Sequence, residues 1–244
     1  MTQSRQRVAP VGGRRIAEDR REAPIAAQAA YDLFADRYDK WVWQEFWHRN
    51  EWPHVDKLIA SAPRSTAVLD AGTGTGFYLR LLQLPGRSTC GVDISHQMLR
   101  VARQRVEDKG WLIQADVRFL PFRSATFDVI LLNRVASHLA DLPRLVEELS
   151  RVLSQPGRLI VSDIAPEHDY SCTEFETPGS RVLVETHKHR IDNWSQAARS
   201  AGLAMTHQHV ISACNAEWLP DAGFTSIDRS GVRPIGFVLG LDRA

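Results

Sequence analysis

The segment VLDAGTGTGFYLRLL, residues 68–82, constrains the fold of this chain more than any other part of it. It begins with a short apolar run typical of a buried strand and ends with an apolar run of helical character. Gly72, Gly74 and Gly76 stand between them at alternate positions. Glycine permits the tight turn and the close approach of a ligand to the backbone that such connections use. The segment therefore predicts a strand, a ligand-binding turn and a helix.

Two phosphate-binding fingerprints fit this turn poorly. The dinucleotide fingerprint needs a third glycine where this chain has Phe77, and the phosphate loop needs a lysine that is missing. Asp70 lies two residues before the first glycine. A carboxylate there would repel a pyrophosphate and would accept hydrogen bonds from a cationic amine. The turn therefore favours a ligand that carries an amine and no phosphates.

Strand and helix patterns alternate from residue 66 onward. Apolar runs typical of strands are 66–71, 88–93, 111–116, 127–133 and 158–164. Helical patterns are 25–43 and 45–60 before them, 77–82, 95–107 and 141–153 between them, and 190–202 after them. Ser95 and Asp141 are expected to cap their helices, and closing strands are expected at 204–213 and 235–242. The alternation predicts an α/β fold, a Rossmann-like, mostly parallel sheet with helices on both faces.

The chain is expected to form a single domain over residues 25–244, with residues 25–62 as an N-terminal helical cap. Residues 1–24 mix arginine, glycine and acidic residues without apolar periodicity, which is typical of a disordered tail. Residues 165–189 show no clear period and predict an inserted loop or small cap after the fifth strand. Their length and position are typical of a lid.

Composition limits the partners of the chain. A net charge of +1 provides no large field to attract nucleic acid or an anionic membrane, and no apolar run approaches the ~20 residues that span a bilayer. The three cysteines are odd in number and widely spaced, so neither a disulfide framework nor a zinc site is expected. We expect a cytoplasmic protein without a metal, whose oligomeric state the sequence leaves open.

Three acidic residues stand at the ends of three successive predicted strands. Asp70 ends the first, Asp93 the second and Asp116 the third. The carboxyl ends of parallel strands meet at one edge of a sheet, where open α/β sheets bind ligands. Asp93 can accept both hydroxyls of a ribose, and Asp116 can accept from an adenine amine. An adenosine with an amino-acid tail and no phosphates would satisfy all three carboxylates, although each acid alone could be an ordinary strand-end residue.

At this point the chain resembles the class I S-adenosylmethionine-dependent methyltransferases of the small-molecule type. The resemblance covers about residues 26 to 244, and the segments that carry it, in order, are VLDAGTGTG, GVDISHQML, QADVRFLPF, FDVILLN and LSRVLSQPGRLIVSD. It implies a Rossmann-like seven-stranded sheet and S-adenosyl-L-methionine as the cofactor.

The resemblance also implies roles for individual residues around that cofactor. The backbone of Gly72, Thr73 and Gly74 would approach the methionine part, and Asn133 would face its amino group. Asp93 would hold the ribose, Ile94 and Met98 would pack on adenine or ribose, and Asp116 and Val117 would meet the adenine. Tyr38, in the segment ADRYD, would reach the cofactor.

Candidates for the acceptor side are less specific. His138, in NRVASHL after the fourth strand, is a candidate general base, but it could equally pack at a helix start. His187, His189 and Asn193 could bind the acceptor or lie on the surface. Trp43 and Trp47 could cover the sulfonium or cup an aromatic acceptor, but aromatic residues in a cap more often pack a helix onto a sheet.

Three hypotheses about function follow. The first is a methyltransferase that acts on O, N or C of a small-molecule or carrier-bound acceptor, with no nucleic acid as partner. The second is an enzyme on the same scaffold that uses S-adenosylmethionine for other chemistry, such as cyclisation of its aminobutyryl arm with release of methylthioadenosine. The third is a non-catalytic protein that binds the cofactor.

Overall fold

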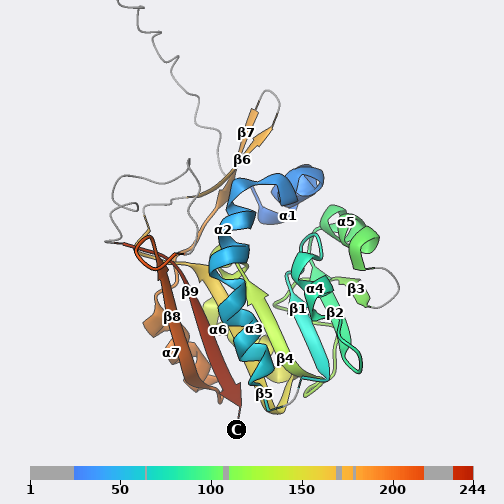
Figure 1. Ribbon diagram of the computed structural model, residues 1–244, viewed down its shortest axis with the longest axis vertical. Helices are drawn as coiled ribbons and strands as arrows, with labels where there is room; N and C mark the ends of the chain where they lie inside the picture. The colour runs from blue at the N-terminus through green and yellow to red at the C-terminus, as the bar shows by residue number, and fades with distance from the viewer. Residues whose placement is uncertain are drawn as a thin grey trace, which may run out of the picture.

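Seven strands form one sheet in the order β3-β2-β1-β4-β5-β9-β8 (Figure 1). Their bounds are β1 Ala67–Ala71, β2 Ser88–Asp93, β3 Trp111–Gln114, β4 Phe127–Asn133, β5 Leu153–Ile164, β8 Ala204–Ser212 and β9 Pro234–Arg243. β9 runs antiparallel to both of its neighbours, and the other pairings are parallel. This confirms the predicted α/β class with a seven-stranded, mostly parallel sheet.

The computed structural model describes residues 25–63, 65–106, 110–168, 172–177, 180–216 and 233–243. The predicted tail, residues 1–24, lies outside the described residues. Within the described part of the chain, none of the helices has the length and apolar character needed to cross a membrane.

The chain changes direction across the sheet between β1 and β4. From β1 it moves outward to β2 and β3, and then returns to pair β4 with the other side of β1. The connections on either side therefore leave in opposite directions, and a crevice opens at the carboxyl ends of these two strands. The topology predicts that a ligand binds there.

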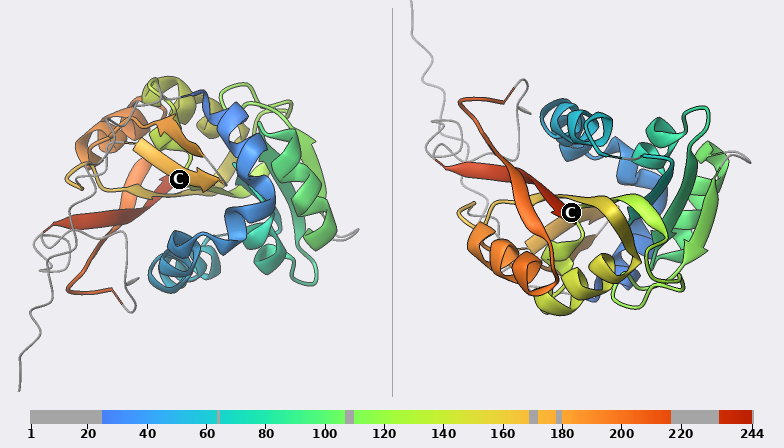
Figure 2. Two further views of the ribbon diagram at one scale, coloured as in Figure 1. Left: turned by 90° about the horizontal axis from the view of Figure 1, so that it is seen from above. Right: turned by 90° about the horizontal axis from the view of Figure 1, so that it is seen from below.

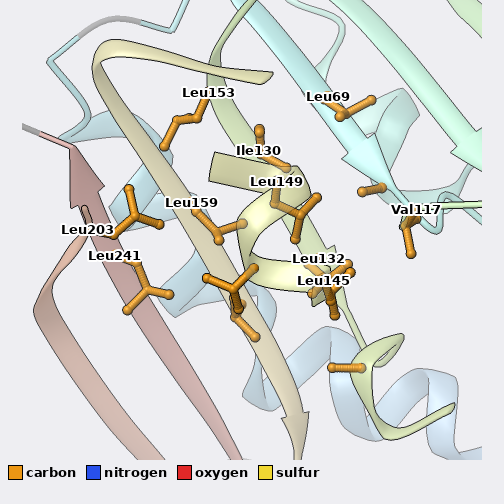
Figure 3. Close-up of a cluster of buried hydrophobic side chains, with 14 of the residues drawn as sticks. Leu69, Val117, Ile130, Leu132, Leu145, Leu149, Leu153, Leu159, Leu203 and Leu241 are labelled. Atoms are coloured by element: carbon orange, nitrogen blue, oxygen red, sulfur yellow. The ribbon is translucent and has the colours of Figure 1, made fainter. Parts of the chain in front are cut away.

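Helices cover both faces of the sheet (Figure 2). One face carries α3 (Trp52–Ala60), α4 (Phe77–Leu82) and α5 (His96–Val106), and the other carries α6 (Leu142–Val152) and α7 (Ile191–Ser200). The buried strand β4 serves both layers, because successive side chains of a strand point to opposite faces. Val129 and Leu131 pack in the first layer, whereas Ile130 and Leu132 pack in the second. Figure 3 shows the hydrophobic cluster of the second layer, in which leucines of α6 pack against the sheet.

Two predicted helix caps are present. The Ser95 hydroxyl accepts a hydrogen bond from the Met98 amide at 3.1 Å, at the start of α5. The Asp141 carboxylate accepts from the Arg144 amide at 3.0 Å, at the start of α6. Each cap satisfies a backbone donor that has no partner within its helix.

The N-terminal cap is divided into more and shorter helices than the sequence indicated. The expected helices 25–43 and 45–60 are wrong in their bounds, because the chain forms α1 (Ala27–Phe34), the 3₁₀ helix η1 (Ala35–Lys40), α2 (Val42–Asn50) and α3. Trp41 is extended, with φ −69° and ψ 129°, which separates η1 from α2. Pro53 lies in the first turn of α3, where a residue without an N–H is tolerated. In the interior of one continuous helix over α2 and α3, the same proline would remove a hydrogen bond and break the helix.

The segment expected as a loop or small cap, 165–189, contains a β-hairpin. β6 (Cys172–Thr177) pairs antiparallel with β7 (Ser180–Glu185), and the Ile25 amide donates to the Leu183 carbonyl at 2.9 Å. Phe175 of the hairpin stacks on Phe34 of α1, with ring centroids 4.3 Å apart. The hairpin and α1 therefore pack as one unit beside the carboxyl edge of the sheet (Figures 1 and 2).

Trp47 of α2 packs directly on the backbone of β9. Its side chain is buried, and a Cβ added to Gly236 would lie 2.6 Å from Cζ3 of the indole. Gly236 is therefore the residue that allows the cap to approach the sheet this closely.

We expect Gly236→Ala to destabilise the protein by about 1–3 kcal/mol, because the new methyl group must displace the Trp47 ring. Urea-induced unfolding followed by circular dichroism measures this change. In a Trp47→Leu background, the same substitution should lower the free energy of unfolding by clearly less. An equal cost in both backgrounds would show that the indole is not the obstacle.

Candidate functional site

A pocket opens at the carboxyl edge of the sheet, at the crevice between β1 and β4. It encloses about 690 Å³, counting the space that is open to solvent. The predicted site residues that line it are Tyr38, Gly72, Gly74, Asp93, Ile94, Met98, Asp116, Val117, Asn133 and His138. Asp70 and Thr73 line a smaller recess of about 360 Å³, which shares several lining residues with the pocket. The structure therefore brings these residues together.

The glycine turn after β1 forms part of the wall. Gly72, Gly74 and Gly76 have φ angles of 80°, 53° and 73°, in the left-handed region that favours glycine. A Cβ at Gly72 would lie 2.1 Å from Cγ2 of Val135, so a side chain there would collide with the segment that follows β4. The Gly72 amide donates to the Val92 carbonyl at 2.7 Å and joins the turn to β2.

Asp93, at the end of β2, organises the pocket from one side. Its Oδ2 accepts from the Gly74 amide and its Oδ1 from the Ser95 amide, both at 2.8 Å. Burial raises the pKa of Asp93 to about 6, although these hydrogen bonds favour the charged form. Each carboxylate oxygen has a further lone pair, so Asp93 can still accept hydrogen bonds from a ligand.

Asp70, at the end of β1, lies in the recess. Its Oδ2 accepts from the Thr73 hydroxyl at 2.7 Å. Burial raises the pKa of Asp70 to about 6, and the nearby Asp93 carboxylate adds to the shift. A cation placed in the recess would offset the effects of burial and of the Asp93 charge on Asp70, because an opposite charge stabilises the ionised carboxylate.

Asp116, after β3, is already paired. Its Oδ2 lies 2.6 Å from Nη2 of Arg118, and the Arg118 backbone amide donates to Oδ1 at 2.9 Å. Partial burial opposes ionisation, but these hydrogen bonds lower the pKa of Asp116 below its ordinary value. The group is therefore a charged acceptor at the pocket wall, with its orientation fixed by Arg118.

A buried ion pair, absent from the sequence-based predictions, supports the recess. Arg134 pairs with the fully buried Glu51, which also accepts hydrogen bonds from the hydroxyls of Tyr78, at 2.7 Å, and Ser162. The Arg134 guanidinium lies over the rings of Trp47 and Tyr78, at 5.4 Å from each centroid. Burial opposes the charge, but the Glu51 carboxylate raises the pKa of Arg134 well above its usual range.

Three buried side-chain donors of residues that line the recess have no hydrogen-bond partner among the described residues. They are Nε2 of Gln44, Nδ2 of Asn133 and Nε of Arg134. Buried polar groups in folded proteins are almost always paired, so three orphaned N–H donors around one recess point to an acceptor group of a ligand. The recess therefore combines donors for an anion with a carboxylate, Asp70, for a cation.

Sequence reasoning missed Gln44, Glu51 and Arg134. The only signal was that Arg134 directly follows the predicted site residue Asn133. Arg134 adopts φ 57°, a left-handed conformation that is uncommon outside glycine, and this turns its side chain back toward Glu51. A non-glycine residue in this conformation cannot be recognised from the sequence.

His138 lies in η3 (Ala136–His138) and contacts two elements outside the sheet. Its Nε2 is 2.8 Å from the Tyr31 hydroxyl of α1, and its Nδ1 is 3.3 Å from the Glu185 carbonyl of β7. Burial lowers the pKa of His138 from 6.5 to about 4, so the imidazole is neutral at neutral pH. Tyr31, which the sequence analysis did not select, lines the same pocket.

Apart from His138, the residues expected on the acceptor side lie outside the lining of this pocket. Trp43 and Trp47 line a separate small cavity. His189 contacts two backbone carbonyls at and just after η3, at 3.1 and 2.7 Å, and the His187 amide donates to a third at 2.7 Å. These two histidines therefore position η3, whereas Asn193 is exposed on α7.

The fold and the site together define a class of protein. A sheet with one reversed strand near its edge, a crevice between β1 and β4, and acids at successive strand ends suit a nucleoside with an amino-acid tail. Among the described residues, no group of three or more His, Cys, Asp and Glu side chains is arranged to hold a metal ion. This is the architecture of an α/β protein built to bind S-adenosylmethionine.

Comparisons with known proteins identify the family. Residues 69–161 match the model of the family described as methyltransferase domain. The demethylmenaquinone methyltransferase of Thermotoga maritima is 38% identical over 148 residues, 57% of this chain and 62% of that protein. The phosphatidylethanolamine N-methyltransferase of Cereibacter sphaeroides is 31% identical over 144 residues, 53% of this chain and 67% of that protein.

A solved structure agrees at the level of the fold. The S-adenosylmethionine-dependent methyltransferase from Mesorhizobium loti matches with a TM-score of 0.61 at 20% identity, over 79% of this chain and 97% of that chain. The chain belongs to the class I S-adenosylmethionine-dependent methyltransferase family, as its sequence motifs predicted. It spans between 29 and 67% of the length of the curated relatives compared.

Binding of S-adenosylmethionine at pH 6 should release protons. Asp70 and Asp93 have folded-state pKa values of about 6, above the ordinary 3.8, so each is partly protonated at this pH. A cationic amine and ribose hydroxyls favour the ionised carboxylates and lower both pKa values. Calorimetric titration in two buffers of different ionisation enthalpy measures the release.

The Asp93→Asn variant is the matched control. It should release fewer protons and bind about 1.5–3 kcal/mol more weakly, as expected for a lost hydrogen bond to a charged group. Equal binding enthalpies in both buffers for the natural protein, or unchanged affinity of the variant, would contradict the assignment of these carboxylates.

Proposed function

We propose that this protein binds S-adenosylmethionine in the pocket and recess and transfers its methyl group to a small-molecule or carrier-bound acceptor. The observation that carries the proposal is the composition of the recess. Asp70 can accept from an ammonium group, and the unpaired donors of Gln44, Asn133 and Arg134 can hold a carboxylate. This set suits the zwitterionic end of an amino acid and does not suit a phosphate.

The rest of the pocket fits the nucleoside part. Asp93 would accept the ribose hydroxyls, and Asp116 would accept from the adenine amine while it keeps its pairing with Arg118. Ile94 and Met98 line the pocket beside them and supply apolar surface for the adenine ring. S-adenosylmethionine would supply an electrophilic methyl group on a sulfonium, which the protein has only to orient toward the acceptor.

Aromatic residues line the part of the pocket where we propose that the sulfonium and the acceptor meet. Tyr38 and Tyr31 line the pocket with ring centroids 5.8 Å apart in an edge-to-face arrangement. Aromatic faces attract cations, and a desolvated cation–π contact contributes up to about 2 kcal/mol. We propose that Tyr38 contacts the cofactor and that the acceptor enters beside Tyr31 and His138.

The family leaves the acceptor open. Relatives are named for acceptors that include demethylmenaquinone, a malonyl-[acyl-carrier protein], phosphatidylethanolamine and a tRNA uridine. The net charge of +1 gives this chain little attraction to a polyanion, which favours a small or carrier-bound acceptor over a tRNA.

Mass spectrometry of the products separates the three hypotheses for function. The protein is incubated with S-adenosylmethionine alone and with a library of small hydroxyl, amine and activated-carbon acceptors. We expect S-adenosylhomocysteine only when an acceptor is present. Methylthioadenosine without an acceptor would indicate cyclisation of the aminobutyryl arm instead, and no product despite measurable cofactor binding would indicate a non-catalytic protein.

The recess predicts selectivity for the cofactor carboxylate. We expect S-adenosylmethionine to bind at least about tenfold more tightly than its decarboxylated analogue, because a hydrogen bond to a charged group contributes about 1.5–3 kcal/mol. Gln44→Met should reduce this preference by removing one donor, whereas Gln208→Met, on the exposed part of β8, should not. Equal affinities of the natural protein for the two ligands would show that the cofactor carboxylate does not bind in the recess.

A further inference from the structure

Tyr31 and His138 form a hydrogen-bonded pair in the wall of the pocket. Their side chains come from different elements, α1 and η3, and meet at 2.8 Å between the Tyr31 hydroxyl and Nε2 of His138. Both residues line the pocket on the side where the acceptor is proposed to enter. The direction of this hydrogen bond decides which of the two side chains can accept a proton from the acceptor molecule.

The second contact of the imidazole fixes that direction. Nδ1 of His138 lies 3.3 Å from the backbone carbonyl oxygen of Glu185, and a carbonyl oxygen can only accept. Nδ1 therefore carries the proton. A neutral imidazole has one N–H, so Nε2 has a lone pair and accepts from the Tyr31 hydroxyl.

This tautomer leaves His138 unable to take a proton from an acceptor directly. Its basic nitrogen already receives the Tyr31 hydroxyl, so a proton from elsewhere must pass through the tyrosine oxygen. The phenol oxygen can accept a hydrogen bond while it donates its own, as hydroxyl groups in hydrogen-bonded chains do.

We propose that Tyr31 is the residue that contacts an acceptor hydroxyl, and that His138 receives the proton through it. The proposal rests on the proposed methyl transfer and changes the sequence-based role of His138 from direct base to the second member of a relay. It also specifies an acceptor that carries a proton on its nucleophilic oxygen.

The relay balances atoms and charge. As the acceptor oxygen gains the methyl group, its proton passes to the Tyr31 oxygen and the Tyr31 proton passes to Nε2 of His138. The carbon–sulfur bond electrons remain on sulfur, so the sulfonium charge disappears as an imidazolium forms. The product ether, S-adenosylhomocysteine and protonated His138 then carry the same total charge as the reactants.

The surroundings of His138 suit this role. Burial lowers the pKa of His138 to about 4, which keeps it neutral and able to accept at neutral pH. An oxygen that has gained a methyl group before losing its proton is a strong acid, so even a weak base can remove that proton. The Glu185 carbonyl accepts from Nδ1–H and stabilises the imidazolium.

A purely structural role for Tyr31 is the alternative. Its ring packs edge-to-face on Phe175 and Tyr38, with centroids 5.3 and 5.8 Å away, and would hold α1 against the hairpin without any proton transfer. Tyr31→Phe keeps this ring packing and removes the hydroxyl, so it separates the two roles.

The first test is nitrogen-15 NMR of the histidines in the full chain, without ligands, and His138→Asn assigns the signals. We expect the Nδ1–H tautomer for His138, neutral down to about pH 5. In Tyr31→Phe, the Nε2 resonance should shift because its donor is lost, whereas Tyr38→Phe should leave it unchanged. An Nε2–H tautomer in the natural protein would overturn the relay.

The second test uses a hydroxyl acceptor identified by the product assay. Tyr31→Phe and His138→Asn should each lower kcat by about 10²-fold or more, as for loss of general base catalysis, with unchanged affinity for S-adenosylmethionine. The double variant should be no slower than the single variants, because the two residues act as a unit. His96→Gln, an exposed histidine on α5, should retain full activity.

These results distinguish the relay from the proposed function. Full activity of Tyr31→Phe together with an inactive His138→Asn would show that the histidine contacts the acceptor itself. Multiplicative losses in the double variant would also overturn the relay. If the natural protein transfers no methyl group to any hydroxyl acceptor, the relay fails even when the NMR result confirms the hydrogen bond, whereas transfer to nitrogen or carbon would leave the proposed function intact.

Discussion

The parallel pairing of β4 with β1 is the constraint on which the rest of the structure depends. Because helices cover both faces, the central strands must be apolar on both sides, and polar side chains can gather only at the strand ends. The change of direction at this pairing opens a crevice at the carboxyl edge. Asp93 and Asn133 end their strands at that edge, and Asp70 is the last residue but one of β1. The topology that buries the core therefore also assembles the site.

Much of this could be predicted from the sequence, because each signal was local. Continuous apolar runs marked the strands, and Ser95 and Asp141 marked the helix starts. The cap and the insert were harder, since their structure depends on contacts between distant segments. The hairpin β6–β7 packs on α1 through Phe175 and Phe34, a contact that no local pattern records. The role of Glu51 was invisible for the same reason, because its partners lie far along the chain.

The buried charges show how the site is held ready for a ligand. Isolating a charge from water is costly, and a buried ion pair recovers that cost only with good geometry and further hydrogen bonds. Glu51 has such partners in Arg134, Tyr78 and Ser162. Asp70 accepts from the Thr73 hydroxyl as its one hydrogen-bond donor within the described part of the chain, and burial raises the pKa of Asp70 to about 6. A cationic ligand group at the recess completes an electrostatic arrangement that the protein alone leaves incomplete.

The position of Tyr31 depends on how α1 is attached to the rest of the molecule. The next residue of α1, Asp32, accepts from the Ser95 hydroxyl at 2.5 Å and from the Gln97 amide at 3.1 Å, at the start of α5. Asp36 pairs with Arg100 on the same helix, but this pair is exposed, and such pairs contribute little singly. The buried contacts of α1 with the hairpin add to the attachment that the Asp32 hydrogen bonds provide. Because the hairpin also provides the Glu185 carbonyl, the same packing that fixes the tyrosine orients the imidazole it contacts.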